Sequence, residues 1–365
     1  MLDLLPRSLP FLTAGLPGLG GTIKILPEDF VVEELPDVIP CGEGEHLYLW
    51  VEKRGRDTPE VAQDLARALA VSPRDVGYAG LKDRQAVTRQ WFSLPAPTPS
   101  AEVEIPGARV LAMSRHGHKL RSGALRGNRF WIRLRGVRDR TALEPLLDLL
   151  VAAGVPNWFG PQRFGRRGDN ASLGAALIGI GHHPLAARAM RDAFLRKMAL
   201  SALQSELFNR LLAARVSERR LTELEVGDVV LVPEDQRPFV ARDDSLGARV
   251  AAFEAAVTGP MFGSKMLAAE GAPGSRELQA LEQAGLQPEA FVRGGRELRG
   301  TRRPYRFKLA GVDLRDDGES LMLSFDLPAG GYATSILREL TRSGSSGTSS
   351  AGTWEAALEA PEGEA

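Results

Sequence analysis

The chain has 365 residues, of which 43% are hydrophobic and 25% are charged, and its 46 basic and 46 acidic residues balance to a formal net charge of zero. This composition is typical of a globular protein with room for two domains, each with its own core. No apolar run approaches the roughly 20 residues that span a bilayer. The N-terminal sequence MLDLLPRSLPFL lacks the features of a signal peptide, so we expect a cytoplasmic protein with no membrane partner.

The first part of the chain combines short strands with a helix. The segments TIKILPEDFVVEEL (22–35) and HLYLWVEK (46–53) show the alternation typical of half-buried strands. Thr58 and Pro59 predict the cap and the first turn of a helix. The predicted apolar stripe of that helix comprises Val61, Leu65, Ala68 and Leu69.

A strictly alternating segment, RFWIRLR (129–135), predicts a strand with two different faces. The face turned to the core would carry Phe130, Ile132 and Leu134. The opposite, positive face would carry Arg129, Arg133 and Arg135. The next segment, TALEPLLDLLVAAG (141–154), predicts a helix that ends at Gly154.

The character of the sequence changes at about residue 155. A long alanine- and leucine-rich helical pattern covers about 184–215, turn-rich segments follow it, and alternating segments return from 302. We therefore predict one domain formed by 1–154 and 302–342, whose two parts share a sheet, and an inserted domain at 155–301. Because crossover helices do not regularly separate the strands, an α+β fold with a mixed or mainly antiparallel sheet is favoured over a doubly wound one. The tail, 343–365, is predicted to be disordered.

The basic residues are concentrated in two segments despite the neutral total. RHGHKLRSGALRGNRFWIRLRGVRDR (115–140) contains a single acid, Asp139, and RGGRELRGTRRPYRFK (293–308) contains a single acid, Glu297. This distribution favours a polyanion over a membrane as the partner. The alternative is that these arginines lie on ordinary solvated surfaces.

The sequence offers few ligands for a metal or a nucleotide. Cys41 is the only cysteine, which excludes an internal disulfide and a thiolate cluster. His116 and His118 have the spacing of a metal-binding pair, but Arg115 and Lys119 flank them and would repel a cation. No phosphate-binding G-x-x-x-x-G-K-[ST] loop is present. We predict no metal, and a metal- or nucleotide-dependent enzyme is disfavoured.

The segment GYAGLKDRQAVTRQWFSL (77–94) contains the strongest chemical signal. Asp83 lies between Lys82 and Arg84, and nearby cations favour the ionised form of a carboxylate. An ionised carboxylate can act as a base or as a nucleophile. Because VTRQWFSL (87–94) continues as a strand, we expect Asp83 on a loop at a sheet edge, where reactive groups often lie. Taken alone, the triplet is more typical of an exposed turn.

Five segments together resemble the TruD family of tRNA pseudouridine synthases. GLKDRQAVTRQ (80–90) resembles the family's motif around its catalytic aspartate. The four further segments that resemble family motifs are ILPEDFVVEE (25–34), KLRSGALRGNRFWIRLR (119–135), VPNWFGPQRFG (155–165) and FDLPAGGYATSILREL (325–340). They occur in family order and span nearly the whole chain, although between about 170 and 300 the match rests on position and length.

The resemblance implies a pseudouridine synthase fold with a mixed, largely antiparallel sheet and the family's inserted α/β domain, the TRUD domain. It also implies isomerisation of a uridine, expected to be uridine 13 of tRNA, to pseudouridine without a cofactor. Asp83 would be the catalytic carboxylate, and the flipped-out base would contact Phe30, Asn128 and Phe130. Phe30 and Phe130 are also interpretable as core residues, and Asn128 as the start of a strand.

The resemblance leaves the other contacts of the site open. Lys24 and Lys82 are both candidates for the ionic partner of Asp83, with a slight preference for Lys24, because an extended loop points neighbouring side chains apart. The residues expected to contact RNA phosphates, each of which could also be idle on the surface, are Arg121, Arg126, Arg163, Arg166 and Arg167. We expect a monomer. The competing hypothesis is a non-catalytic RNA-binding protein or RNA chaperone. Whether the Asp83 carboxylate attacks the base or the sugar stays undecided.

Overall fold

The computed structural model describes residues 8–99, 103–235 and 237–342, so the predicted disordered tail lies outside the described residues. Two compact units are present, which we call the sheet unit and the helical unit. The sheet unit comprises Pro17–Glu144, Leu309–Ala333 and the segment from Leu340; the helical unit comprises the segment up to Leu16, Pro145–Lys308 and Thr334–Glu339. The predicted domain boundaries at 155 and 302 stay predictions. None of the described helices is long and apolar enough to cross a membrane.

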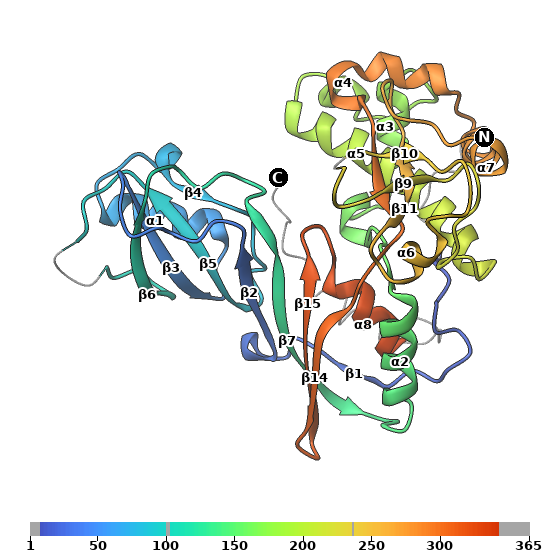
Figure 1. Cartoon of the computed structure of the whole chain (residues 1–365). Helices are drawn as coiled ribbons and strands as arrows, with labels where there is room; N and C mark the ends of the chain where they lie inside the picture. The colour runs from blue at the N-terminus through green and yellow to red at the C-terminus, as the bar shows by residue number, and fades with distance from the viewer. Residues whose placement is uncertain (1–7, 100–102, 236, 343–365) are drawn as a thin grey trace. The chain divides into compact units, whose positions relative to one another are not determined.

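The sheet unit is built on a nine-stranded sheet (Figure 1). Its strands are β1 (Gly20–Thr22), β2 (Phe30–Pro36), β3 (His46–Arg54), β4 (Gly77–Tyr78), β5 (Val87–Leu94), β6 (Ala108–His116), β7 (Leu125–Val137), β14 (Ala310–Asp316) and β15 (Ser320–Pro328). The main path runs β14-β15-β7-β2-β5-β3-β6, while β1 pairs with β7 and β4 with β5. Every pairing in this sheet is antiparallel except that of β2 with β5.

This topology confirms two predictions. The sheet is mixed and largely antiparallel, and the first and last parts of the chain share it through the pairing of β15 with β7. The expected strand at 22–35 is interrupted, because Pro27 begins a short 3₁₀ turn, η1 (Pro27–Asp29), and β2 starts only after it. The strand predicted at 87–94 coincides with β5.

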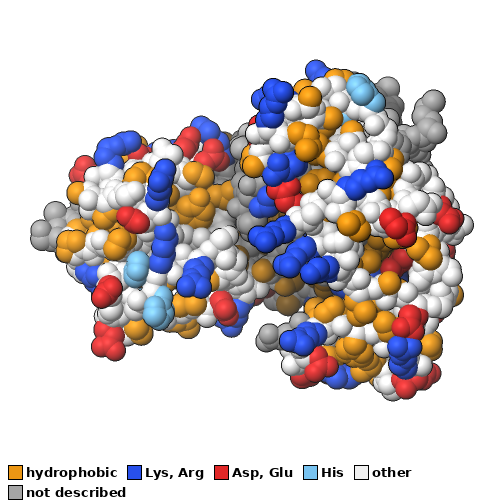
Figure 2. Space-filling view, turned by 90° about the horizontal axis from the view of Figure 1, so that it is seen from above, with side chains coloured by type: hydrophobic (Ala, Val, Ile, Leu, Met, Phe, Trp, Pro, Cys, Tyr) orange, Lys and Arg blue, Asp and Glu red, His pale blue; other side chains and the backbone are white. Residues whose placement is uncertain are grey.

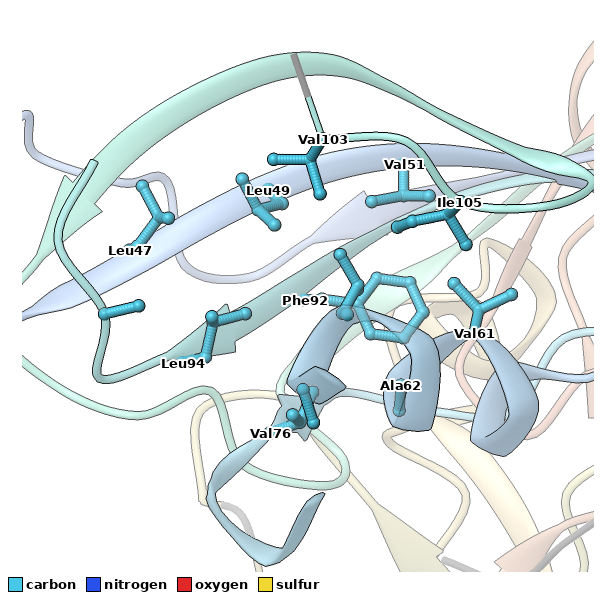
Figure 3. Packing of buried hydrophobic residues seen from close by; sticks show 13 residues of the cluster. Leu47, Leu49, Val51, Val61, Ala62, Val76, Phe92, Leu94, Val103 and Ile105 are labelled. Atoms are coloured by element: carbon cyan, nitrogen blue, oxygen red, sulfur yellow. The ribbon is translucent and has the colours of Figure 1, made fainter. Parts of the chain in front are cut away.

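Helix α1 (Thr58–Ala68) covers one face of the sheet and closes a hydrophobic core against β3 and β5 (Figure 3). The core residues shared by these elements are Leu47, Leu49, Val51, Val61, Ala62, Leu65, Ala66, Phe92 and Leu94. The predicted stripe is correct for Val61 and Leu65 but wrong for Ala68, which is exposed. The helix is rotated so that Ala62 and Ala66 complete the apolar face at the spacing of four residues.

The predicted cap of α1 is wrong by one residue. Asp57 is the cap, and its backbone N–H donates to the Glu60 carboxylate at 3.2 Å. Thr58 is instead fully buried, and its hydroxyl donates to the Gln90 side chain at 2.8 Å. A buried hydroxyl with a partner inside the protein is satisfied there and is not free to cap the helix.

The helical unit contains helices around two small sheets. Its helices are α2 (Leu143–Ala153), which begins in the sheet unit, α3 (Asn170–Leu177), α4 (Ala186–Ala189), α5 (Ala193–Ser217), α6 (Gly247–Ala251), α7 (Gly271–Gln283) and most of α8 (Ala333–Thr341). Its strands are β8 (Val155–Pro156), β9 (Val229–Leu231), β10 (Phe239–Val240), β11 (Ala256–Met261), β12 (Thr301–Pro304) and β13 (Arg306–Phe307). One sheet has the order β10-β9-β11-β12, and the other pairs β13 with β8.

Two helix predictions are confirmed in outline. Helix α2 ends before Gly154, whose φ of 79° is a conformation that glycine adopts without steric cost. The long pattern at 184–215 forms α4 and α5, with a break between them. Asp192 causes the second helix to start anew, because its carboxylate accepts the N–H of Leu195 at 3.0 Å as an N-cap.

Many arginines of the two basic segments pair inside the protein. On β7 the pairs are Arg129–Asp326 at 2.7 Å, Arg133–Asp317 at 2.9 Å and Arg135–Asp29 at 2.7 Å. The strand has the two predicted faces, with Phe130, Ile132 and Leu134 buried and the arginines opposite, but neighbouring carboxylates neutralise the positive charge. Arg302 is buried against Glu277 at 2.8 Å and is also not available to a polyanion. Figure 2 shows basic and acidic side chains interleaved on one face of the molecule.

We predict that Phe92→Ala lowers the free energy of unfolding by about 3–5 kcal/mol, the usual cost of truncating a fully buried phenylalanine. The ring of Phe92 lies between the sheet and α1, so the cavity cannot be filled by solvent (Figure 3). Denaturant titration measures the loss. Gln63→Ala, on the exposed side of the same helix, should stay within about 0.5 kcal/mol. Equal losses for both variants would contradict this core assignment.

Candidate active site

The parallel pairing of β2 with β5 brings two distant segments to one end of the sheet. Val31 lies opposite Val87 in this pairing, and both strands run in the same direction. The segments that precede the two strands therefore meet at the same end. Lys24 and Asp83, which are 59 residues apart, come into contact there. The loop of Asp83 thus lies at the end of a strand and not at a lateral sheet edge, because β5 is an interior strand.

The Asp83 carboxylate is held from two sides and stays accessible. Its Oδ2 accepts a hydrogen bond from the Lys24 ammonium, and its Oδ1 accepts one from the N–H of Gln85 at 3.0 Å. The Lys24 side chain is 1% exposed, whereas the Asp83 side chain is 23% exposed. The carboxylate is therefore the member of the ion pair that a ligand can reach.

Lys24 adopts a left-handed backbone conformation, with a φ of 57°. This conformation costs a residue with a side chain roughly 1–2 kcal/mol, and such strain gathers at functional sites. The Lys24 ammonium lies 4.2 Å from the centre of the Phe30 ring, whose negative face attracts a cation. The ring and the Asp83 carboxylate together hold the lysine in this conformation.

The two cations that flank Asp83 in the sequence pair with other carboxylates. Lys82 Nζ lies 3.1 Å from Glu34 Oε2, and both side chains are buried. Arg84 pairs with carboxylates at the start of α1. The loop therefore directs both side chains to carboxylates other than that of Asp83. Of the two lysines considered, Lys24 contacts the Asp83 side chain.

Hydrogen bonds anchor the loop that carries Asp83 to α1 and β5. Thr58 Oγ1 accepts a hydrogen bond from the backbone N–H of Lys82 at 3.0 Å. The same hydroxyl donates to Gln90, whose side-chain amide donates to the carbonyl oxygen of Gly80 at 2.9 Å. The loop is thus tied to rigid elements at Gly80 and at Lys82, which restricts where the next residue, Asp83, can point.

Three phenylalanines from adjacent strands form a row beside the ion pair. Phe30 on β2 and Phe130 on β7 meet edge to face, with ring centres 6.0 Å apart. Phe130 is stacked on Phe325 of β15, with ring centres 5.5 Å and ring planes 26° apart. All three rings are buried, as the core interpretation of Phe30 and Phe130 expects. The row also borders the reactive group, since Phe30 contacts the Lys24 ammonium.

Asn128 lies inside β7 and does not begin the strand, so the turn interpretation of this residue is wrong. It is directly opposite Glu34 and on the same face as Phe130, because side chains alternate along a strand. Its Oδ1 is shielded from solvent and accepts no hydrogen bond from the residues that the structure describes. A buried acceptor without a donor costs about 1–3 kcal/mol. Asn128 therefore offers a position for a donor group of a ligand.

Sequence reasoning does not single out Phe325 and Glu34, although both lie in segments that resemble family motifs. Their place in the site depends on register, because Phe325 lies opposite Phe130 and Glu34 lies opposite Asn128. Register cannot be read from an alternating segment alone, since several alignments bury the same face. The only local signal in the sequence is that Glu34 stands at the same alternating positions of β2 as Phe30 and Val32, which puts an acid on the inward face.

The arginines expected to contact RNA lie in both units. Arg121 and Arg126 belong to the sheet unit, and Arg163, Arg166 and Arg167 belong to the helical unit. Arg126 and Arg163 each donate a hydrogen bond within the protein. The other three are exposed and form no ion pair with any residue in the described ranges 8–99, 103–235 and 237–342.

The histidines with metal-like spacing contact each other through their rings. His116 and His118 have ring centres 6.0 Å apart in an edge-to-face arrangement. Within the described part of the chain, no group of three or more histidine, cysteine, aspartate or glutamate side chains is placed to hold a metal ion. The absence of a metal and of a cofactor stays a prediction.

Comparison with known proteins gives consistent matches over nearly the whole chain. A family model described as tRNA pseudouridine synthase D (TruD) matches residues 8–190 and 181–340. A relative named tRNA pseudouridine synthase D from Anaeromyxobacter dehalogenans is 48% identical over 338 residues, which cover 92% of this chain and 96% of the relative. A relative of the same name from Thermus thermophilus is 41% identical over 341 residues, which cover 92% of this chain and 93% of the relative.

A solved structure shares the fold. A crystal structure from Methanosarcina mazei, a structural genomics target assigned to tRNA pseudouridine synthase D (TruD), superimposes with a TM-score of 0.73 and 26% identity. The match covers 91% of this chain and 96% of that one. This likeness confirms the predicted fold class.

We predict that the two lysines near Asp83 differ in their effect on stability. Lys82→Met leaves the buried Glu34 charge without a partner and should cost about 3–5 kcal/mol of unfolding free energy. Lys24→Met leaves the Asp83 carboxylate without its lysine, but water can reach this carboxylate. The loss of unfolding free energy should therefore be roughly 1–3 kcal/mol. Denaturant titrations of both variants test the order. A larger loss for Lys24→Met would contradict the burial of the Lys82–Glu34 pair.

Proposed function

Because the chain belongs to the TruD family of tRNA pseudouridine synthases, we propose that it isomerises uridine 13 of tRNA to pseudouridine, with Asp83 as the catalytic carboxylate and without a cofactor. The observation that carries this proposal is the accessible Asp83 carboxylate, paired with a buried lysine beside an aromatic row. The enzyme is an isomerase acting on tRNA. A tRNA substrate also favours a cytoplasmic location, and we expect a monomer.

The reaction explains why a carboxylate suffices. Uracil must be detached from the ribose, turned, and rejoined through carbon 5, and neither oxidation nor loss of a group occurs. An ionised carboxylate can attack carbon 6 of the base or carbon 1′ of the sugar, or it can remove a sugar proton. In each case the carboxylate must be charged and close to the nucleotide. The Lys24 ammonium stabilises that charge, and its burial strengthens the interaction.

The residues on the same sheet face suit a flipped-out base. We propose that Phe30 and Phe130 form the wall against which the base lies. No residue described in the structure donates a hydrogen bond to the shielded Oδ1 of Asn128. We propose that this oxygen accepts a hydrogen bond from the imide N–H of uracil. Because Phe130 is stacked on Phe325 and also meets Phe30 edge to face, only the remaining part of its surface can meet the base.

We predict that Asp83→Asn abolishes pseudouridine formation, with a loss greater than about 10³-fold in turnover, because an amide cannot supply a charged oxygen. Affinity for tRNA should stay within about threefold, since phosphate contacts dominate binding. Mapping of pseudouridine in unmodified tRNA gives the first readout, and filter binding gives the second.

Asp37→Asn is the matched control, because Asp37 is exposed in the same unit and should leave both readouts unchanged. Full product with Asp83→Asn would refute the proposed role. Wild-type protein that binds tRNA but leaves every uridine intact would favour the competing hypothesis of an RNA-binding protein or chaperone. Product at a position other than uridine 13 would refute only the positional assignment.

We propose that Arg121, Arg166 and Arg167 contact tRNA phosphates, because they are exposed and free of ion pairs within the described ranges. The combined change of Arg166 and Arg167 to alanine should weaken tRNA binding and reduce the slope of log affinity against log salt by about 1–2. Arg129→Ala, which removes an arginine already paired with Asp326, should change the slope little. Equal slopes for all three proteins would argue against these phosphate contacts.

A further inference from the structure

Lys53 on β3 lies beneath the loop that carries Asp83. Its side chain is fully buried, and its Nζ lies within hydrogen-bond distance of three backbone carbonyl oxygens. These oxygens belong to Arg56 at 2.6 Å, Lys82 at 3.2 Å and Asp83 at 3.0 Å. One buried nitrogen thus binds the backbone of the proposed catalytic residue and of the residue before it.

The three acceptors match the three donors of an ammonium group. A protonated lysine has three N–H donors and no acceptor, so each carbonyl oxygen can receive one hydrogen. A neutral amine has only two N–H donors, and its lone pair would face the third oxygen. Loss of the proton therefore leaves one of these carbonyl oxygens, all at least partly buried, without the lysine donor, which is unfavourable. The geometry of the loop depends on the charged form of Lys53.

The charges around Lys53 come from the two elements packed against it. The loop contributes the Asp83 carboxylate and the Lys82 ammonium, and the start of α1 contributes Asp57 and Glu60. Burial lowers the pKa of Lys53 to about 8, although the nearby carboxylates, Asp83 foremost, favour the charged form. The ammonium is thus retained at neutral pH and lost at moderately alkaline pH.

We propose that Lys53 is a positioning residue for the isomerisation, which fixes the backbone of Lys82 and Asp83 so that the carboxylate points at the flipped-out nucleotide. Lys53 acts through the loop and does not touch the substrate. This inference rests on the proposed function. Displacing a reacting group by about 1 Å can cost on the order of 100-fold in rate, so a loop anchor of this kind affects turnover more than binding.

The first test compares Lys53→Met with Tyr48→Phe. Tyr48→Phe also removes a hydrogen bond from a buried β3 side chain to a backbone carbonyl, that of His118, which is not part of the Asp83 loop. For Lys53→Met we expect kcat to fall about 10- to 100-fold, with KM for tRNA within about threefold. Tyr48→Phe should keep kcat within about threefold. A folded Lys53→Met protein with unchanged kcat would overturn the inference.

The second test keeps the inference falsifiable if Lys53→Met does not fold. Wild-type kcat should fall as the pH rises through about 8. Lys53→Arg, whose guanidinium stays charged, should lack this alkaline loss even if its kcat at neutral pH is lower. A wild-type kcat that is constant from pH 7 to about 9, or an identical alkaline loss in Lys53→Arg, contradicts a positioning role that depends on the Lys53 charge.

Stability distinguishes this effect from simple unfolding. Because the pKa of Lys53 is lower in the folded protein, the unfolded chain binds more protons between about pH 8 and the ordinary value of 10.5. Lys53 therefore contributes added stability as the pH rises through this window, while kcat falls. Thermal unfolding of wild type and Lys53→Arg across this range measures the difference. A wild-type protein that is inactive at every pH refutes the proposed function and, with it, a role of Lys53 in the isomerisation, whereas an active wild type whose kcat does not depend on Lys53 refutes the positioning role alone.

Discussion

The parallel pairing of β2 with β5 is the constraint on which the candidate site depends. In a sheet where all other pairings are antiparallel, this one places the segments before two strands at the same end. Lys24 and Asp83 meet there because neither strand can shift register without moving its buried face into solvent. The ion pair is thus a consequence of strand order, and it could not form between the same residues on antiparallel neighbours.

Buried lysines surround the aspartate loop in an unusual concentration for a protein interior. Lys24 and Lys82 each pair with a carboxylate, and Lys53 binds carbonyl oxygens. Each buried ammonium costs desolvation energy that only good partner geometry offsets. The three groups hold the loop from different sides, whereas hydrophobic contacts alone would leave its direction less defined. The arrangement is best explained as a way to fix the position of the Asp83 carboxylate.

Arginine content is a poor guide to the RNA-binding surface of this protein. Three arginines of β7, Arg129, Arg133 and Arg135, pair with aspartates. Arg302 and Arg306 are buried and bind acceptors of the helical unit. Arg306 is buried, and this burial lowers its pKa to about 10. Exposed arginines that form no ion pair within the part of the chain that the structure describes, such as Arg166 and Arg167, are therefore better candidates for phosphate contacts than the most basic segments of the sequence.

The sequence by itself determined the fold class, the shared sheet and the family, because alternating strands and five ordered motifs are properties of the chain alone. It also placed Asp83 on a loop before β5. Only the tertiary structure decided that Lys24 contacts Asp83, that Lys82 binds Glu34 and that Phe325 stacks on Phe130. These contacts depend on strand order and register, and neighbours in sequence such as Lys82 and Asp83 are directed to different partners by the backbone between them.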